Sequence, residues 1–242
     1  MPDDGARTTI AGPGRLVRPT RMRAAIARGM SASKRDAPHF YVSTDIIVET
    51  LLAGARREGG TPGKPRVTVT ALLIHRLAAA LRAHPSFNAL ATDEGFVQVD
   101  AINIGVAIAL DEGLIAPALL DCAGAEPVAI AAALEDLVAR ARKGRLRAAE
   151  LTGATFTLSN LGMFSVTQFA AILPPLQVGI LAVGRATPRP VVIDGKILIR
   201  NVMSATLSAD HRAVDGAGAG QFLTTFKGLV EGGSDAPSGG PP

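Results

Sequence analysis

The chain has 242 residues, 48% of them hydrophobic and 19% charged, with a formal net charge of +4. This composition is typical of a globular protein of one large or two small domains, and it excludes an intrinsically disordered chain. Aromatic residues make up only 4%, and the excess positive charge is spread along the chain. Both observations disfavour a nucleic-acid-binding surface, which needs stacking side chains or a basic cluster.

The single cysteine, Cys122, cannot form an intrachain disulfide, and no neighbouring residue marks it as a reactive thiolate. No metal site is predicted, because the histidines are too scattered for ligand spacing; they are His39, His75, His84 and His211. The N-terminus begins with acidic residues, and no apolar run is long enough to span a membrane. We therefore expect a cytoplasmic protein with no membrane partner.

Composition divides the chain into three parts. Residues 1–14 are polar and rich in Gly, Pro and Thr, and residues 232–242 are rich in Gly, Pro and Ser. Such compositions predict a flexible leader and a flexible tail. No second linker and no internal repeat interrupts residues 15–231, which we expect to form a single domain.

In the first part of this domain, helices and a strand alternate. Apolar residues at helical spacing predict an amphipathic helix over residues 20–35. Residues 39–50 are rich in β-branched residues and alternate in polarity, which predicts a strand. Residues 68–85 predict a helix that is capped near Thr68 or Thr70 and ends around His84.

The middle of the chain is expected to form short strands followed by a helix. Residues 96–110 are interpreted as two strands with a short connection, and residues 113–121 as a third. Residues 127–146 predict a helix, with Pro127 at its start and Gly144 just past its end.

The last part combines strands with a final helix. A strand running into a turn is predicted over residues 155–162, and three strands over 177–212, with Asp194 and Gly195 as a hairpin turn. Residues 217–231 predict the last helix. The order of elements indicates an α/β fold, in which helices cover one face of a mixed β-sheet.

His211 lies in the stretch SADHRAVDG, at the predicted junction between the last long strand and the last helix. Loops at such junctions often carry catalytic side chains, so His211 is a candidate general base. The alternative is a charged turn, because Asp215 and Gly216 are ordinary turn residues.

Ser159 and Asn160 end an otherwise apolar strand, where a hydroxyl and an amide can donate hydrogen bonds. They could stabilise an oxyanion, or they could simply form a turn. The sequence offers no activated nucleophile, since it lacks a Gly-x-Ser-x-Gly elbow. A base and an oxyanion donor without a protein nucleophile suit direct transfer between two bound substrates.

The stretch SADHRAVDG resembles the His-x-x-x-Asp-Gly signature of the dihydrolipoamide acyltransferases, the E2 cores of 2-oxo acid dehydrogenase complexes, and of the related chloramphenicol acetyltransferases. Further segments resemble this family in the same order over residues 15–231: RMRAAIARGM, APHFYVSTDI, NIGVAIALDEGLIAPAL, GATFTLSNLGMF, PPLQVGILAVGR and RPVVIDGKI. The resemblance implies a chloramphenicol-acetyltransferase-like two-layer α/β fold. It also implies acyl transfer between dihydrolipoamide and coenzyme A.

The resemblance assigns roles to four residues. His211 would be the general base that takes a proton from the thiol of coenzyme A, and Ser159 would donate a hydrogen bond to the oxyanion of the tetrahedral intermediate. Asp215 matches the aspartate that anchors the active-site loop, in related enzymes through an ion pair with an arginine. Arg23 is the match for that arginine.

The resemblance also indicates coenzyme A contacts, and here the chain departs from the family pattern. Asn160 and Gly184 match positions near coenzyme A. Ala109 stands where relatives often have an aspartate, and Asp111, two positions away, could substitute for it. Gly29 replaces an arginine that is usual in the opening helix, which removes a family ion pair or ligand contact.

Partners follow from the same resemblance. No lipoylation turn precedes residue 15, so the lipoyl group is expected in trans, on the lipoyl domain of another protein, with E1 and E3 components as further partners. Family members form homotrimers with the active site at the subunit interface. The tail carries no large apolar residue to serve as an anchor, so we expect a trimer that does not assemble further.

Two other functions stay open at this point. The chain could be a small-molecule O-acetyltransferase of the chloramphenicol-acetyltransferase kind, or a non-catalytic scaffold of the E2 type. The motifs leave the acyl group open between acetyl, succinyl and branched-chain.

Overall fold

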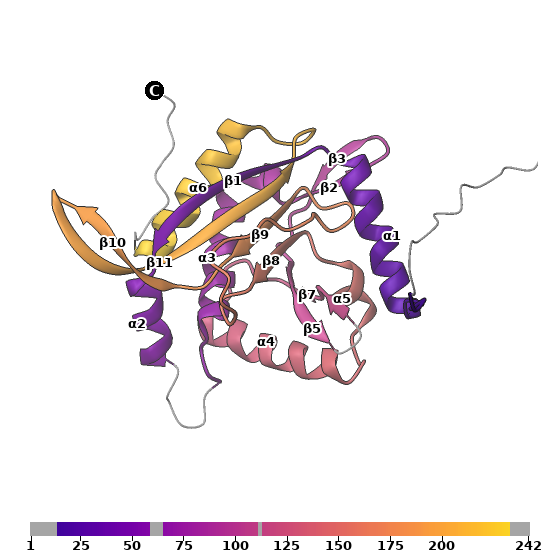
Figure 1. The fold of residues 1–242 in the computed structure, drawn as a ribbon, viewed down its shortest axis with the longest axis horizontal. Coiled ribbons are helices and arrows are strands. Elements are labelled where there is room, and N and C mark those ends of the chain that lie inside the picture. The colour runs from indigo at the N-terminus through magenta and orange to yellow at the C-terminus, as the bar shows by residue number, and fades with distance from the viewer. Residues whose placement is uncertain (1–13, 59–64, 111–112, 233–242) are drawn as a thin grey trace, which may run out of the picture.

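The computed structural model describes residues 14–58, 65–110 and 113–232. Apart from Gly14 and Gly232, the expected leader and tail lie outside the described residues, and so does Asp111. The described residues form a mixed α/β fold around one main sheet (Figure 1).

The main sheet of the described chain has seven strands. Its path runs through β1 (His39–Ile47), β11 (Lys196–Asp210), β9 (Gly179–Val183), β8 (Phe156–Asn160), β4 (Ile104–Val106) and β7 (Ala118–Leu119), and β10 (Thr187–Ile193) pairs with β11 outside this path. Strand β8 is parallel to β9 and to β4, whereas the other pairs are antiparallel. The predicted mixed sheet is thus confirmed.

The predicted hairpin is present at its expected position. Asp194 and Gly195 join β10 to β11 with φ values of 50° and 75°, which are the left-handed conformations that a tight hairpin turn requires. Figure 1 shows the β10–β11 hairpin projecting from the body of the molecule.

Three helices cover one face of the sheet, as expected. They are α3 (Val69–Ala83), α4 (Pro127–Arg142) and α6 (Gly216–Glu231). Helix α3 begins where the sequence predicts, because the Thr68 hydroxyl accepts a hydrogen bond from the Ala71 N–H, and it ends at His84. Phe156 and Leu158 of β8 and Phe222 of α6 are fully buried in the core between these layers.

The opposite face of the sheet is also partly covered. Helix α1 (Arg21–Asp36) and the segment over residues 161–178 lie on this side, because the Gln168 side chain donates to Thr206 of β11 and the Ser33 hydroxyl of α1 donates to the Leu173 carbonyl. Ser159 points to this face. Helices thus cover one face of the sheet as expected, and α1 with this segment covers part of the other.

Several short elements differ from the sequence-based expectation. Four elements were not predicted: α2 (Glu49–Glu58), η1 (Pro85–Phe87), β2 (Ala89–Thr92) and α5 (Ala148–Thr152). Where three strands were expected over residues 96–121, the structure has five: β3 (Gly95–Gln98), β4, β5 (Ile108–Leu110), β6 (Gly113–Ile115) and β7. The strand predicted to Thr50 stops at Ile47, because Glu49 begins α2. The Glu49 carboxylate accepts hydrogen bonds from the backbone and side-chain amides of Asn201, which lies in β11.

Candidate active site

His211 lies in the turn after β11 and is exposed to solvent. Its backbone N–H donates to the Pro38 carbonyl at 3.0 Å, and its ring packs against the Phe40 ring with the centroids 4.6 Å apart. Within the described residues no hydrogen bond engages its ring nitrogens. The imidazole is thus held from one side and is available to accept a proton.

The residues on either side of His211 bind each other rather than His211. The Asp210 carboxylate is buried, with 2% of its side chain exposed, and forms an ion pair with the Arg212 guanidinium at 2.6 Å. The hydrogen bond to Asp210 raises the pKa of Arg212. The Asp210 carboxylate also accepts the Arg212 backbone N–H at 3.0 Å, so this pair closes the turn that presents His211.

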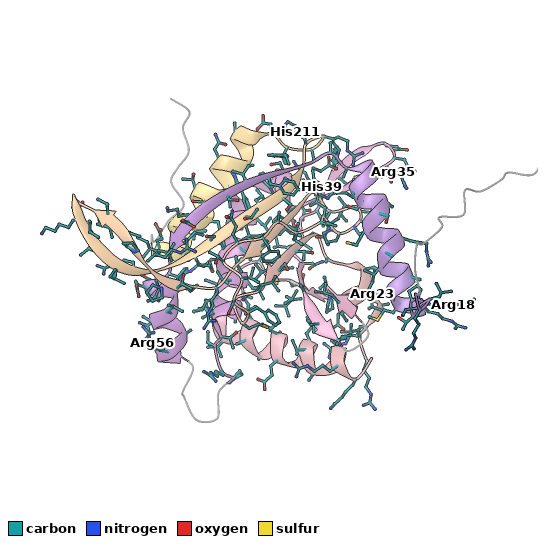
Figure 2. The ribbon with its side chains drawn as sticks, viewed as in Figure 1. Arg18, Arg23, Arg35, His39, Arg56 and His211 are labelled. Carbon is teal, nitrogen blue, oxygen red and sulfur yellow. The ribbon has the colours of Figure 1, made fainter. Side chains whose placement is uncertain are left out.

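Asp215 stabilises the same turn at its other end. Its side chain caps α6 by accepting the Gly218 N–H at 2.8 Å. The expected ion pair with Arg23 is absent from the described part of this chain. Figure 2 shows why: Arg23 lies near the start of α1, far from the end of the sheet that carries His211. Within one chain, Asp215 instead stabilises the N-terminus of α6.

Ser159 opens into a cavity of about 720 Å³ between α1, the sheet and the segment over residues 171–177. Its hydroxyl forms no hydrogen bond within the described residues and is available as a donor. None of the described residues that line the cavity is charged; they include Ile26, Met30, Leu176 and Ile180. The cavity thus suits an uncharged, largely apolar group beside one hydroxyl.

Thr157 and Gln177 are polar residues of this cavity that were not predicted. The Thr157 hydroxyl donates to the Gln177 side-chain oxygen at 2.7 Å, and the Gln177 amide donates to the Ala154 carbonyl at 3.3 Å. Thr157 could have been found from the sequence, because it stands two residues before Ser159 and must share its face of the strand. No local signal marks Gln177, which is twenty residues further along.

The cavity also explains Gly29. This residue lines the cavity from α1, and an added Cβ atom would lie 3.5 Å from the Pro175 ring. A larger side chain would reach into the space between α1 and Pro175. The glycine at this position therefore enlarges the cavity.

The proposed coenzyme A contacts at Asn160 and Gly184 have structural roles in the chain. The Asn160 amide is occupied at both ends, since it donates to the Thr70 hydroxyl and accepts the Gly162 N–H. Gly184 is buried, and an added Cβ atom would lie 2.0 Å from the Thr167 carbonyl oxygen. Gly184 has no side chain to offer a ligand, and the Asn160 amide already makes two hydrogen bonds within the chain.

Cys122 is not a candidate nucleophile. Burial raises the pKa of its thiol to about 11, so the thiol is protonated at neutral pH. In the part of the chain that the structure describes, no three His, Cys, Asp or Glu side chains gather as metal ligands would. None of the described helices is both long and apolar enough to cross a bilayer.

Ser159 and His211 do not meet within one chain. Ser159 lies in the cavity, whereas His211 is not among the described residues that line it. The segment over residues 174–177 separates this cavity from a smaller one of about 220 Å³, which Asp210 and Arg212 line. One chain therefore contains both candidate groups in two separate places.

Solved structures define the class of this fold. The structure matches a chloramphenicol acetyltransferase with a TM-score of 0.55 at 14% identity, over 84% of this chain and 92% of the other, which shows the fold alone. It matches the dihydrolipoamide acetyltransferase of Azotobacter vinelandii with a TM-score of 0.86 at 28% identity, over 91% and 93% of the two chains. That structure was solved to investigate a serine, a histidine and an asparagine in the catalytic mechanism.

A third structure, the cubic core of a pyruvate dehydrogenase multienzyme complex, matches with a TM-score of 0.86 at 28% identity, over 96% of each chain. The expected chloramphenicol-acetyltransferase-like fold is confirmed.

Sequence comparison identifies the family. The model of the 2-oxoacid dehydrogenases acyltransferase (catalytic domain) matches residues 12–236. The chain is 36% identical over 232 residues to the dihydrolipoyllysine-residue acetyltransferase component of the pyruvate dehydrogenase complex of Zymomonas mobilis. The aligned region covers 95% of this chain and 53% of that protein. The chain thus spans about half the length of this relative. It belongs to the catalytic-domain family of the 2-oxoacid dehydrogenase acyltransferases.

Proposed function

We propose that the chain transfers an acetyl group between dihydrolipoamide and coenzyme A. Its relatives are named dihydrolipoyllysine-residue or dihydrolipoamide acetyltransferases, which supports the acetyl group and the dihydrolipoyl substrate. His211 takes the proton from the attacking thiol of coenzyme A, and the thiol sulfur forms a bond to the thioester carbon. Ser159 donates its hydroxyl to the resulting oxyanion. The intermediate collapses by breaking the bond to the dihydrolipoamide sulfur, which recovers the proton from His211.

The spacing of three residues supports these roles. In the Azotobacter vinelandii enzyme, the serine and histidine under study are separated by as many positions as Ser159 and His211. The asparagine follows the histidine by the same interval as Asp215 follows His211. Asp215 takes this place as the residue that caps α6 and fixes the turn.

The observation that carries the proposal is the separation of Ser159 from His211 in one chain. His211 is exposed to solvent and Ser159 is buried at the cavity wall, and among the described residues neither has a partner that completes a site. We infer a homotrimer in which His211 of one subunit meets Ser159 of the next. A symmetric ring of head-to-tail contacts closes such a set of sites.

The described lining of the cavity, which carries no charge, indicates which substrate lies beside Ser159. Dihydrolipoamide is a short hydrocarbon chain with two thiols, and it fits an apolar cavity better than the phosphates of coenzyme A do. We place the acyl-dihydrolipoamide arm here, supplied in trans by a lipoyl domain, with E1 and E3 components as partners. A cytoplasmic location and a trimer that does not assemble further stay predictions.

The test is an acetyl-transfer assay with acetyl-CoA and free dihydrolipoamide, with chloramphenicol as a competing acceptor. We expect activity with dihydrolipoamide, none with the alcohol, and loss of at least about 1000-fold in His211→Ala. Transfer to the alcohol alone would favour an O-acetyltransferase. Coenzyme A binding without turnover would favour the scaffold, and wild-type activity in His211→Ala would refute the assigned base.

A further inference from the structure

The tripeptide Pro38-His39-Phe40, at the start of β1, contacts both halves of the candidate site. Pro38 accepts the His211 backbone N–H, and Phe40 packs against the His211 ring. His39 is directed elsewhere, toward the segment that forms one side of the cavity. Figure 2 shows His39 and His211 near the same end of the sheet, where His39 pairs with Asp210 in the strand register.

The hydrogen bonds of His39 define its tautomer. Its Nδ1 lies 2.7 Å from the Ala37 carbonyl oxygen, which can only accept, so Nδ1 carries the proton. Its Nε2 accepts the Leu173 backbone N–H at 3.1 Å. Only a neutral imidazole protonated at Nδ1 makes both bonds, since the imidazolium has no free acceptor.

Leu173 is held at both of its backbone groups by side chains far away in sequence. His39 accepts its N–H, and the Ser33 hydroxyl donates to its carbonyl at 2.7 Å. Its side chain is fully buried. Leu173 is therefore a fixed point from which the next residues extend along the cavity.

Leu173 is the first residue of what we call the wall segment (residues 173–177). Pro174, Pro175, Leu176 and Gln177 line the cavity that contains Ser159 as well as the smaller cavity beside Asp210 and Arg212. Leu176 has a φ of 70°, which a leucine adopts only where surrounding contacts enforce it. The wall segment thus depends on its anchoring contacts for its shape.

We propose that His39 is a positioning residue, whose neutral Nδ1–H tautomer holds the wall segment in place through Leu173. Pro38 and Phe40 hold His211 from the same strand, so one tripeptide sets the wall of the cavity relative to the base. This role rests on the proposed function in so far as it concerns the substrate that occupies the cavity. The contact itself is independent of the reaction.

Two substitutions separate the two hydrogen bonds of His39. In His39→Gln the side-chain oxygen reaches about as far as Nε2 and can accept the Leu173 N–H, while the bond to Ala37 is lost. In His39→Asn the amide reaches only as far as Nδ1, so the bond to Ala37 survives and the bond to Leu173 is lost. Ser33→Ala removes the other contact to Leu173 and tests the same anchor from α1.

The first measurement is hydrogen–deuterium exchange over residues 168–177, where Pro174 and Pro175 contribute no amide hydrogens. We expect the Leu173 amide to exchange about 10-fold faster in His39→Asn and in Ser33→Ala, and within about 3-fold of wild type in His39→Gln. His84→Gln is the matched control, because His84 Nε2 bonds Thr225 on the opposite side of the sheet. This control should leave the Leu173 amide unchanged.

The second measurement is steady-state kinetics with dihydrolipoamide. We expect KM to rise about 10-fold in His39→Asn with kcat within about 3-fold, and both to stay near wild type in His39→Gln. A purely structural role would give equal losses in the two variants.

Two results would overturn the proposal. One is an equal effect of His39→Gln and His39→Asn on Leu173 exchange, and the other is slow exchange in both His39→Asn and Ser33→Ala. If the wild-type protein transfers no acetyl group, the proposed function fails, but the exchange data still decide the role of His39.

Discussion

Asp210 and Arg212 form an ion pair across His211, with Arg212 Nη2 2.6 Å from Asp210 Oδ2. Two charges that flank a catalytic histidine in sequence could be taken for its proton partners. The structure shows instead that they neutralise each other and close the turn, which leaves the imidazole without a carboxylate partner in the described chain. The Asp210–Arg212 pair therefore stabilises the turn that carries His211, the proposed base.

Removing the charge of Asp210 tests this role. Asp210→Asn keeps an acceptor for the Arg212 N–H but loses the ion pair, and Asp210 is almost fully buried. We expect kcat to fall about 10-fold and stability to fall by about 1–2 kcal/mol, measured by kinetics and urea unfolding. Arg35→Gln is the control, because the Arg35–Asp36 pair is exposed and should change stability by less than about 0.5 kcal/mol.

Ser159→Ala tests the oxyanion donor. We expect kcat to fall by about 100- to 1000-fold with KM nearly unchanged, since the hydroxyl acts on charge that develops only in the transition state. Thr157→Val removes a neighbouring hydroxyl on the same strand face that is bonded to Gln177. This control should lose about 1 kcal/mol of stability and less than about 10-fold in kcat. Equal losses of kcat in the two variants would argue against a special role for Ser159.

Mixed trimers test whether the site is shared between subunits. His211→Ala and Ser159→Ala are each expected to be nearly inactive alone. If His211 and Ser159 come from adjacent subunits, each mixed trimer regains one intact site, and an equal mixture recovers about a quarter of wild-type activity. The two chains are co-expressed and assayed together. No recovery in verified mixed trimers would place both residues in the same chain's site.

The ion pair between Glu150 and Arg140 should make a pH-dependent contribution to the free energy of unfolding. Its hydrogen bonds to Arg140, at 2.5 and 2.7 Å, lower the pKa of Glu150 from 4.5 to about 2. Because the folded-state pKa is depressed, the stabilisation is complete above about pH 4.5 and is lost as the pH falls toward 2. Glu150→Gln should therefore cost about 2 kcal/mol at pH 7 and clearly less at pH 3.

The measurement is thermal unfolding of wild type and Glu150→Gln at both pH values. Glu135→Gln, on the exposed side of α4, is the control and should change little at either pH. A difference between wild type and Glu150→Gln that is the same at pH 7 and pH 3 would contradict the assignment.

Ser208 offers a stabilising substitution. Its hydroxyl is fully buried in β11 and has no hydrogen-bond partner in the part of the chain that the structure describes. Ser208→Ala removes this unsatisfied group and should raise stability by up to about 1 kcal/mol, or Tm by about 2–4 °C. Ser204→Ala, on the same face of the strand, should instead lower Tm, because the Ser204 hydroxyl donates to Asp45 at 2.5 Å. A decrease in Tm for Ser208→Ala would show that the hydroxyl has a partner in the assembled protein.

Elements with local signals were predictable from the sequence. The Thr68 cap defines the start of α3, Pro127 and Gly144 bracket α4, and the Asp194–Gly195 pair forms the hairpin turn. Helix α2 was missed because its start depends on Asn201, which lies far away along the chain. Too few strands were predicted from the sequence in the middle of the chain. Short interruptions such as Pro117, which lies between β6 and β7, separate these strands in the folded sheet but leave the apolar pattern of the sequence continuous.

The candidate site divides in the same way. The sequence determined by itself that His211 stands at a strand-to-helix junction, that Ser159 ends a strand, and to which family the chain is similar. Such signals are local, because they depend on spacing along the chain. They could not show that Arg23 lies far from His211, or that the side-chain amide of Asn160 already bonds Thr70 and Gly162.

Only the tertiary structure decided how the cavity is built. The contact between Ser33 and Leu173 joins residues 140 positions apart, and His39 reaches the same leucine from 134 positions away. No local preference encodes such pairs, since they form only when α1, β1 and the wall segment pack against one sheet. Packing therefore determines where the residues named by the sequence can act.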